Sequence, residues 1–148
     1  MTKKIYTIGF TKKSLEEFIK SLQKAKITLV IDIRLNNTSQ LAGYSKGKDL
    51  EFLLTAGFGI GYRHELQLAP TKEILDRYKK DNDWSRYERD FIQLLEKNKP
   101  SILRLGEELM KDKTICLLCA EPTPEKCHRR LLVEFWAKNL TEIDIYHL

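Results

Sequence analysis

Two short apolar runs, residues 28–33 and 114–118, constrain the fold of this 148-residue chain more than any other feature. Nearly continuous apolar composition is typical of strands in a parallel sheet, because helices cover both faces of such a sheet. Around these runs, other strand patterns alternate with stretches of helical spacing. We therefore expect one α/β domain over residues 1–148, with a mostly parallel central sheet of about four to five strands flanked by helices.

Periodicity places the other elements of this fold. Strand patterns occur at residues 4–8, 59–64 and 142–147, and helical spacing begins at residues 14, 49, 73, 84 and 100. The helix that begins at residue 14 has a strong start signal, because Ser14 and Glu17 fit a capping box. The polar segment at residues 34–48 is too long for a plain connection, so we expect it to be a functional loop.

Thiol, carboxylate, imidazole and guanidinium groups are concentrated at residues 119–129. Cys119 stands where the second apolar run ends. Thr123 is predicted to be the N-cap of the following helix, with Pro124 at its first position. The side chains of residues 127–129 then lie in the first helical turn, which favours anions. We therefore expect this stretch to form an anion-binding loop.

The α/β architecture brings several distant residues together. In a parallel sheet, ligands bind beyond the carboxyl ends of the strands. The residues that follow separate predicted strands are Gly9, Asp32, Arg34, Tyr62, His64, Cys119 and Glu121. The side chains that we expect to line one solvent-reachable pocket at this edge are Asp32, Arg34, Cys119, Glu121 and Arg129.

The three cysteines are expected to differ in environment. Side chains alternate along a strand, so Cys116 and Cys119 point to opposite faces of the sheet. Their C-x-x-C spacing is therefore not a thioredoxin-like redox pair, and Cys116 is assigned to the core. Cys119 is either an inert buried residue or a nucleophile, and the nearby Glu121 and His128 favour a chemical role. Cys127 either packs its helix onto the sheet or carries a thiolate favoured by the helix dipole.

A cysteine-centred enzyme is the function that these residues favour. Cys119 is the predicted nucleophile, and Glu121, His128 or Asp32 is predicted to handle protons. The predicted binding residues, for a small anionic or nucleotide-like substrate, are Arg34, Arg129, Cys127, Gly9 and Tyr62. Some of these residues have structural alternatives. Asp32 can instead pair with Arg34 as a brace, and His128 can satisfy local polar groups.

Two further hypotheses use the same stretch of chain. In the first, Cys119, Cys127 and His128 bind a metal ion. A fourth ligand is not evident, so we expect no stoichiometric zinc, assign no metal ligand and leave the cofactor open. In the second, the chain is a nucleotide- or nucleic-acid-binding module that uses Arg34 and Arg129, although Arg129 can instead form a structural ion pair with Asp32 or Glu121. Signatures of helix-turn-helix, OB-fold and RNA-recognition domains are not evident.

Charge and composition limit the partners. The chain has 26 Lys and Arg residues against 21 Asp and Glu residues, a net charge of +5 that is scattered along the sequence. We therefore expect at most weak, salt-sensitive binding to nucleic acid. No apolar run approaches the roughly 20 residues that span a membrane, so membrane association is not expected. The odd number of cysteines and the missing secretion signal predict a cytoplasmic location.

The stretch at residues 119–129 also resembles a known family. Cys-Ala-Glu at residues 119–121, followed by Cys-His-Arg at residues 127–129, is similar to the signature of the domain of unknown function 488 family. The other pieces that agree are Thr-Ile-Gly at residues 7–9, Asp-Ile-Arg at residues 32–34, the segment at residues 35–43, Tyr62, His64 and Leu-Ala-Pro-Thr at residues 68–71. Phe10 and Thr11 stand where many members have His-Ser. The resemblance covers nearly the whole chain and implies no particular reaction.

Overall fold

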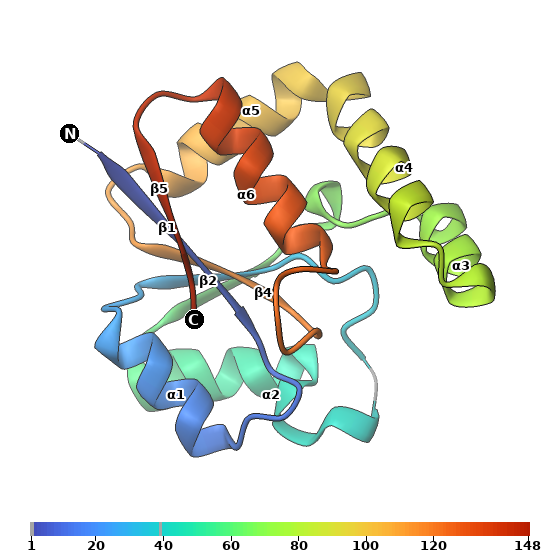
Figure 1. The fold of residues 1–148 in the computed structure, drawn as a ribbon. Coiled ribbons are helices and arrows are strands. Elements are labelled where there is room, and N and C mark those ends of the chain that lie inside the picture. The colour runs from blue at the N-terminus through green and yellow to red at the C-terminus, as the bar shows by residue number, and fades with distance from the viewer. Residues whose placement is uncertain (1, 39) are drawn as a thin grey trace.

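The computed structural model describes residues 2–38 and 40–148 and confirms the α/β fold (Figure 1). Five strands form one sheet in the order β3-β2-β4-β1-β5. Their bounds are β1 Lys3–Gly9, β2 Leu29–Asp32, β3 Gly61–His64, β4 Ile115–Cys119 and β5 Ile143–His147. Every pairing between these strands is parallel, so the predicted, mostly parallel central sheet is confirmed.

Helices cover both faces of the sheet. Their bounds are α1 Leu15–Lys24, α2 Gly47–Phe52, α3 Lys72–Asp81, α4 Trp84–Lys97, α5 Lys99–Met110 and α6 His128–Asn139. Three shorter helical turns are η1 Gln40–Ser45, η2 Leu53–Gly57 and η3 Leu66–Leu68. Figure 1 shows α1 and α2 below the sheet and α5 and α6 above it. The central strands therefore meet apolar side chains on both faces, which is why their sequences are nearly all apolar.

The two faces of the sheet form two separate apolar cores. Leu117 of β4 packs with α4, α5 and α6, whereas its neighbour Cys116 packs with Phe18 and Leu22 of α1. Cys116 is fully buried there, so its predicted core position is confirmed. Because strand side chains alternate, Cys119 shares the face of Leu117 and turns away from Cys116.

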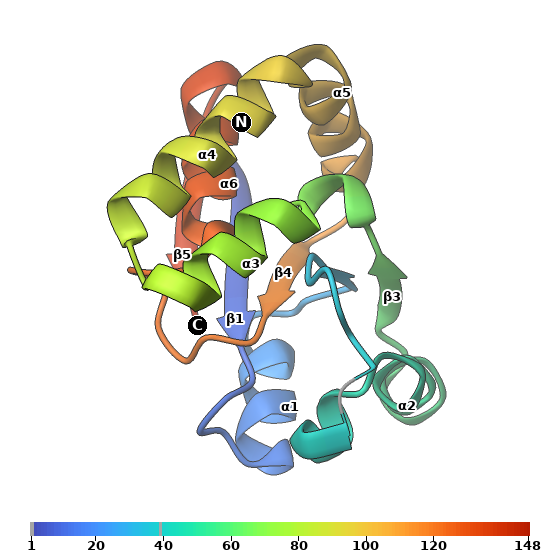
Figure 2. The same cartoon turned by 90° about the vertical axis from the view of Figure 1, so that its right-hand side faces the viewer.

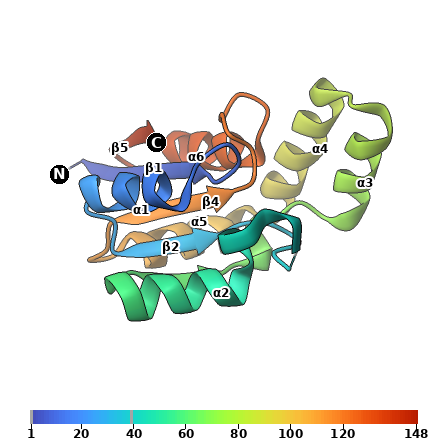
Figure 3. The same ribbon diagram turned by 90° about the horizontal axis from the view of Figure 1, so that it is seen from below.

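An antiparallel pair of helices, α3 and α4, stands beside the sheet (Figure 2). Seen from below, the arrowheads of β2 and β4 point toward this pair, so it lies at the carboxyl edge of the sheet (Figure 3). The turn between the helices is tight, because Asn82 ends α3 in the left-handed conformation and Asp83 caps α4 by accepting the Arg86 N–H. Asn is among the few non-glycine residues that adopt this conformation readily.

The start of α6 differs from the prediction. Thr123 does not cap it. The helix begins at His128, and its N-cap is Cys127, whose backbone is extended with φ −141° and ψ 140°. The Cys127 N–H closes a separate turn by donating to the Pro124 carbonyl at 3.2 Å. The extended residue interrupts helical hydrogen bonding between this turn and α6, so residues 123–126 form a connecting loop.

Two other connections follow the sequence more closely. Ser14 and Glu17 form the predicted capping box at the start of α1. The segment at residues 34–48 contains η1 and the start of α2, while Ser39 lies outside the described residues. Across residues 2–38 and 40–148, no helix combines the length and the apolar character that crossing a lipid bilayer requires.

Candidate functional site

A pocket of about 330 Å³ lies between the carboxyl edge of the sheet and the α3–α4 pair. The connection after β2 contributes Arg34, and the loop after β4 contributes Cys119 and Glu121. His128 at the start of α6 and Tyr87 of α4 also line this pocket. The predicted convergence of Arg34, Cys119 and Glu121 on one pocket is therefore observed, although they come from separate parts of the chain.

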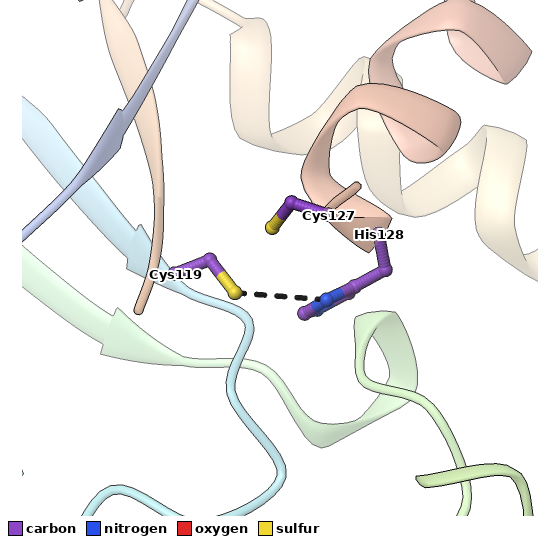
Figure 4. Close-up of side chains that lie close together, drawn as sticks. All are labelled: Cys119, Cys127 and His128. Carbon is purple, nitrogen blue, oxygen red and sulfur yellow. Dashed lines mark hydrogen bonds between the residues drawn. The ribbon is translucent and has the colours of Figure 1, made fainter. Parts of the chain in front are cut away.

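Cys119 and His128 are in direct contact inside this pocket (Figure 4). The Sγ atom of Cys119 lies 3.6 Å from Nδ1 of His128, and Nε2 of the same ring lies 2.8 Å from the Ile33 carbonyl oxygen. A carbonyl only accepts hydrogen bonds, so Nε2 carries the proton and Nδ1 of the neutral ring has a free lone pair. His128 is therefore oriented to accept a proton from the Cys119 thiol.

A second thiol lies beside this pair. Cys127 Sγ, Cys119 Sγ and a ring nitrogen of His128 all lie within 4.8 Å of one another, and all three residues are buried. The Cys127 thiol donates a hydrogen bond to the Cys119 sulfur, which lowers the pKa of Cys119 and raises that of Cys127. Burial opposes the first shift and adds to the second. The pair therefore places the negative charge on Cys119.

The backbone around Cys119 also favours a thiolate. Hydrogen bonds from the Ala120 and Glu121 N–H groups and the positive charge of Arg129 further lower the Cys119 pKa. The carbonyl groups of residues 119–121 are also hydrogen-bonded. Cys119 and Ala120 carbonyls accept N–H groups that follow β1, at 3.3 and 3.1 Å. The Glu121 carbonyl accepts Nη1 of Arg129 at 2.7 Å. The loop is thus fixed with its amides near the sulfur.

Gly9 allows this loop to approach β1. An ideal Cβ atom at residue 9 would lie 1.6 Å from the Glu121 carbonyl oxygen and 3.0 Å from Nη1 of Arg129. Only hydrogen fits between these groups, so the close backbone approach requires glycine. The structure gives Gly9 this packing role, and Gly9 does not line the pocket of Cys119.

Asp32 does not line the pocket, contrary to the prediction. It is fully buried and accepts hydrogen bonds from Arg34 Nε at 2.9 Å and Nη2 at 2.8 Å, and from the Tyr62 hydroxyl. Burial alone raises the pKa of Asp32, but the Arg34 hydrogen bonds and charge outweigh it and keep the pKa below its ordinary value. In the β2–β4 register Asp32 is level with Leu118, which faces the α1 core. Cys119 faces the opposite side, so Asp32 serves as the brace of Arg34.

Arg129 also lies outside the pocket lining. Like Asp32, it was expected to line the pocket, and that prediction is wrong. Its guanidinium is fully buried and donates to the Thr7 hydroxyl at 3.2 Å and to the Glu121 carbonyl. The remaining nitrogen, Nη2, is buried without a hydrogen-bond partner in the described structure. Arg129 thus supports the β4–α6 loop from behind, because the groups that it contacts are backbone and hydroxyl oxygens.

An aromatic wall on one side of the pocket was missed by the sequence analysis. Tyr78 of α3 packs against Trp84 and Tyr87 of α4, with ring centroids 5.9 and 4.8 Å apart. Trp84 and Tyr87 also pack on the buried side of α4, where Trp84 contacts the apolar core and Tyr87 is buried. Their second role depends on how α3 and α4 fold over the sheet edge, which helical spacing alone does not reveal.

Tyr62 and His64 belong to a different pocket. Both line a hollow of about 370 Å³ near the start of α2, together with Lys46, Lys48 and Arg63. His64 Nε2 contacts the Arg34 carbonyl oxygen at 2.7 Å, so this second pocket lies next to the Asp32–Arg34 pair. Tyr62 is therefore separated from Cys119, and the structure does not unite all nine predicted site residues in one cavity.

Comparison with known proteins places the chain in a family. The family model described as "Domain of unknown function DUF488" matches residues 14–136, which is most of the chain and includes the whole β4–α6 loop. Searches of curated proteins and of solved structures found no significant match. The matched range contains Asp32, Arg34 and the cluster of Cys119, Cys127 and His128. The chain therefore belongs to the DUF488 family.

Proposed function

We propose that this protein is an enzyme in which the Cys119 thiolate attacks a small substrate held in the pocket. The observation that carries the proposal is the contact chain from Cys119 Sγ through the His128 ring to the Ile33 carbonyl. A cysteine beside a histidine that a third group orients is a common arrangement for an activated nucleophile. The pocket gives a small molecule a route to the sulfur.

The surroundings of Cys119 supply the remaining chemistry. His128 Nδ1 takes the thiol proton as a general base and can return it to a leaving group. The Ala120 and Glu121 N–H groups stabilise negative charge at the sulfur, as backbone donors do at an oxyanion. The Glu121 side chain also lines the pocket and is the second candidate for proton transfer. Asp32 is paired with Arg34 and has no part in these steps.

The other pocket residues support an anionic, partly planar substrate. Lys79 and Lys126 place two cationic side chains at the pocket, and Arg34 also lines it while its guanidinium stays paired with Asp32. Tyr78 and Trp84 offer aromatic surface on the same side. Pockets of a few hundred Å³ suit small molecules, and ring stacking with ion pairing is how such a pocket selects a nucleotide-like ligand.

Selective alkylation tests the nucleophile. With substoichiometric iodoacetamide at about pH 7, we expect Cys119 to be labelled at least about tenfold faster than Cys116. Cys116 is fully buried and its pKa is raised by burial, whereas the pKa of Cys119 is lowered and its sulfur borders the pocket. Peptide mass spectrometry of the folded protein gives the labelled fraction of each cysteine.

Two variants control this experiment. Cys119→Ser changes little volume, so it is expected to keep the fold while removing the fast label. Cys116→Ser removes a thiol from the α1 core and is expected to leave the fast label unchanged. Equal, slow labelling of all three thiols, appearing only with denaturant, would show that no thiol is activated and would make a binding module the better account.

A zinc centre on Cys119, Cys127 and His128 is the second candidate function. The observation that favours it is the spacing of the three ligand atoms, all within 4.8 Å of one another. Zinc at about 2.3 Å from sulfur and about 2.0 Å from nitrogen gives a tetrahedral sulfur–nitrogen edge of roughly 3.6 Å. The Cys119–His128 distance is 3.6 Å, and Nε2 of His128 is already held by a carbonyl, as is common for metal-bound histidine.

Elemental analysis separates the two candidates. We expect the purified protein, dialysed without chelator, to hold well under one zinc per chain, because only three ligands gather in the described structure. About one zinc per chain, retained in Cys116→Ser and lost in Cys127→Ser, would instead establish the metal centre. Cys119 would then be a ligand, and the nucleophile proposal would be wrong.

A further inference from the structure

Cys119 and Cys127 approach each other although they belong to different elements. Cys119 ends β4, and Cys127 is the N-cap of α6. Their sulfur atoms lie within 4.8 Å of each other, and Figure 4 shows the Cys127 sulfur on the Cys119 side of the cluster. A disulfide needs the sulfurs at about 2.05 Å, with Cβ atoms roughly 3.5–4.5 Å apart. Only a short movement therefore separates this pair of thiols from a bond.

The chain around Cys127 allows that movement. As an N-cap, Cys127 makes no side-chain hydrogen bond to the N–H groups of α6, so its side chain is not committed to holding the helix. Residues 120–126, which connect the two cysteines, contain no strand or helix. Residues 119–121 are held in place, so small changes in the remaining connection, residues 122–126, can bring the sulfurs together while β4 and α6 stay in place.

One pocket gives reagents from solvent a route to both cysteines. Cys119 and Cys127 both line the pocket between the carboxyl edge of the sheet and the α3–α4 pair. Cys116 lies in the core on the other face of the sheet, with no place in that lining. The third cysteine of the chain is thus an internal control for any oxidation that enters by the pocket.

We propose that Cys119 and Cys127 form a redox-active dithiol, in which hydroperoxides oxidise Cys119 and Cys127 then closes a disulfide with it. This inference rests on the proposed function, because it uses the same nucleophilic sulfur. It adds a modification site and a partner residue, since Cys127 acts here as the resolving thiol.

The two steps balance. The Cys119 thiolate attacks one oxygen of hydrogen peroxide, the O–O bond breaks, and the departing hydroxide takes the proton held by His128 and leaves as water. The Cys127 sulfur then attacks the sulfenic sulfur of Cys119, the S–O bond breaks, and the departing hydroxide leaves as water with the Cys127 proton. Two thiols are oxidised by two electrons in total, and one peroxide is reduced to two water molecules.

The disulfide controls the proposed reaction. It removes the free electron pair of Cys119 from use as a nucleophile, and a small thiol reductant restores it. Without Cys127, the sulfenic acid on Cys119 has no neighbouring thiol and remains open to further oxidation. Cys127 therefore also protects the nucleophile from irreversible damage.

Peptide mapping of oxidised protein tests this inference. Reduced, zinc-free protein is treated with one equivalent of hydrogen peroxide, digested without reductant and analysed by mass spectrometry. We expect a Cys119–Cys127 cross-linked peptide and a fall in free thiols from three to one per chain, with Cys116 the one that remains. Cys116→Ser should give the same cross-link, and Cys127→Ser should give no disulfide and a dimedone-trapped sulfenic acid on Cys119.

The outcomes also separate this inference from the proposed function. Rapid alkylation of Cys119 without any cross-link after peroxide would overturn the dithiol and leave the nucleophile standing. A sulfenic acid that persists on Cys119 of the wild-type protein would do the same. If Cys119 resists both iodoacetamide and peroxide, the dithiol and the proposed function both fail.

Discussion

Asp32→Ala is expected to lower the free energy of unfolding by about 3–5 kcal/mol, because it leaves the buried Arg34 guanidinium without its partner. Asp32 is fully buried and Arg34 nearly so, and two side-chain hydrogen bonds join them. Removing the carboxylate also frees the Tyr62 hydroxyl that now donates to it. Urea denaturation followed by circular dichroism measures the loss.

The same pair gives stability a pH dependence. The pKa of Asp32 is lower in the folded protein than its ordinary value of 3.8. Its ionised form is therefore favoured by folding, so its contribution is complete above about pH 5 and is lost as the pH falls through 3.8 toward the folded pKa. Wild-type protein should lose stability across this acid range, and Asp32→Ala should show a smaller loss there.

An exposed carboxylate provides the matched control. Asp144 lies on the edge strand β5 and is exposed, so Asp144→Ala is expected to change stability by no more than about 0.5 kcal/mol. A loss for Asp32→Ala as small as that for Asp144→Ala would contradict the brace. Replacing Asp32 and Arg34 together with apolar residues should recover part of the loss, since the buried charge is then absent.

Gly9→Ala is the second substitution with a large expected effect. The added Cβ would lie 1.6 Å from the Glu121 carbonyl oxygen, which is backbone and cannot move aside by rotating a side chain. Either β1 or the β4–α6 loop has to shift, and we expect a loss of about 3 kcal/mol, at the upper end of ordinary overpacking. Thermal unfolding of the variant beside the wild-type protein measures it.

Gly9→Ala should also change the reactivity of the Cys119 thiol. A displaced loop takes the Ala120 and Glu121 N–H groups away from Cys119, so its pKa should rise and its alkylation at neutral pH should slow. Gly57→Ala is the control, because a Cβ there meets only a Leu53 methyl group at 3.8 Å. Unchanged stability and unchanged Cys119 labelling in Gly9→Ala would refute the close contact.

The strands and helices of the fold could be predicted from the sequence, because local sequence patterns determine them. Apolar runs marked β2 and β4, the capping pair of Ser14 and Glu17 marked α1, and alternation along β4 separated Cys116 from Cys119. Each of these rules needs only near neighbours in the chain. The convergence of Arg34, Cys119 and Glu121 followed from one topological rule about strand ends.

What the sequence could not supply depends on register and long-range packing. Asp32 pairs in register with Leu118, and a shift of one residue would have turned it to the Cys119 face. The aromatic wall arises because α3 folds back on α4 and brings Tyr78 to Trp84. The α6 start was misplaced because Cys127 is extended, although Thr123 and Pro124 fit the usual start signals.

The pH dependence of Cys119 alkylation tests the central claim most directly. The rate is measured by peptide mass spectrometry from about pH 5 to 10, in folded protein and in urea, where the ordinary thiol pKa is about 8.5. We predict a midpoint for folded Cys119 clearly below that of the unfolded chain, shifted upward in His128→Ala and in Cys127→Ala. A folded midpoint at or above the unfolded value would contradict the account of Cys119 as a nucleophile.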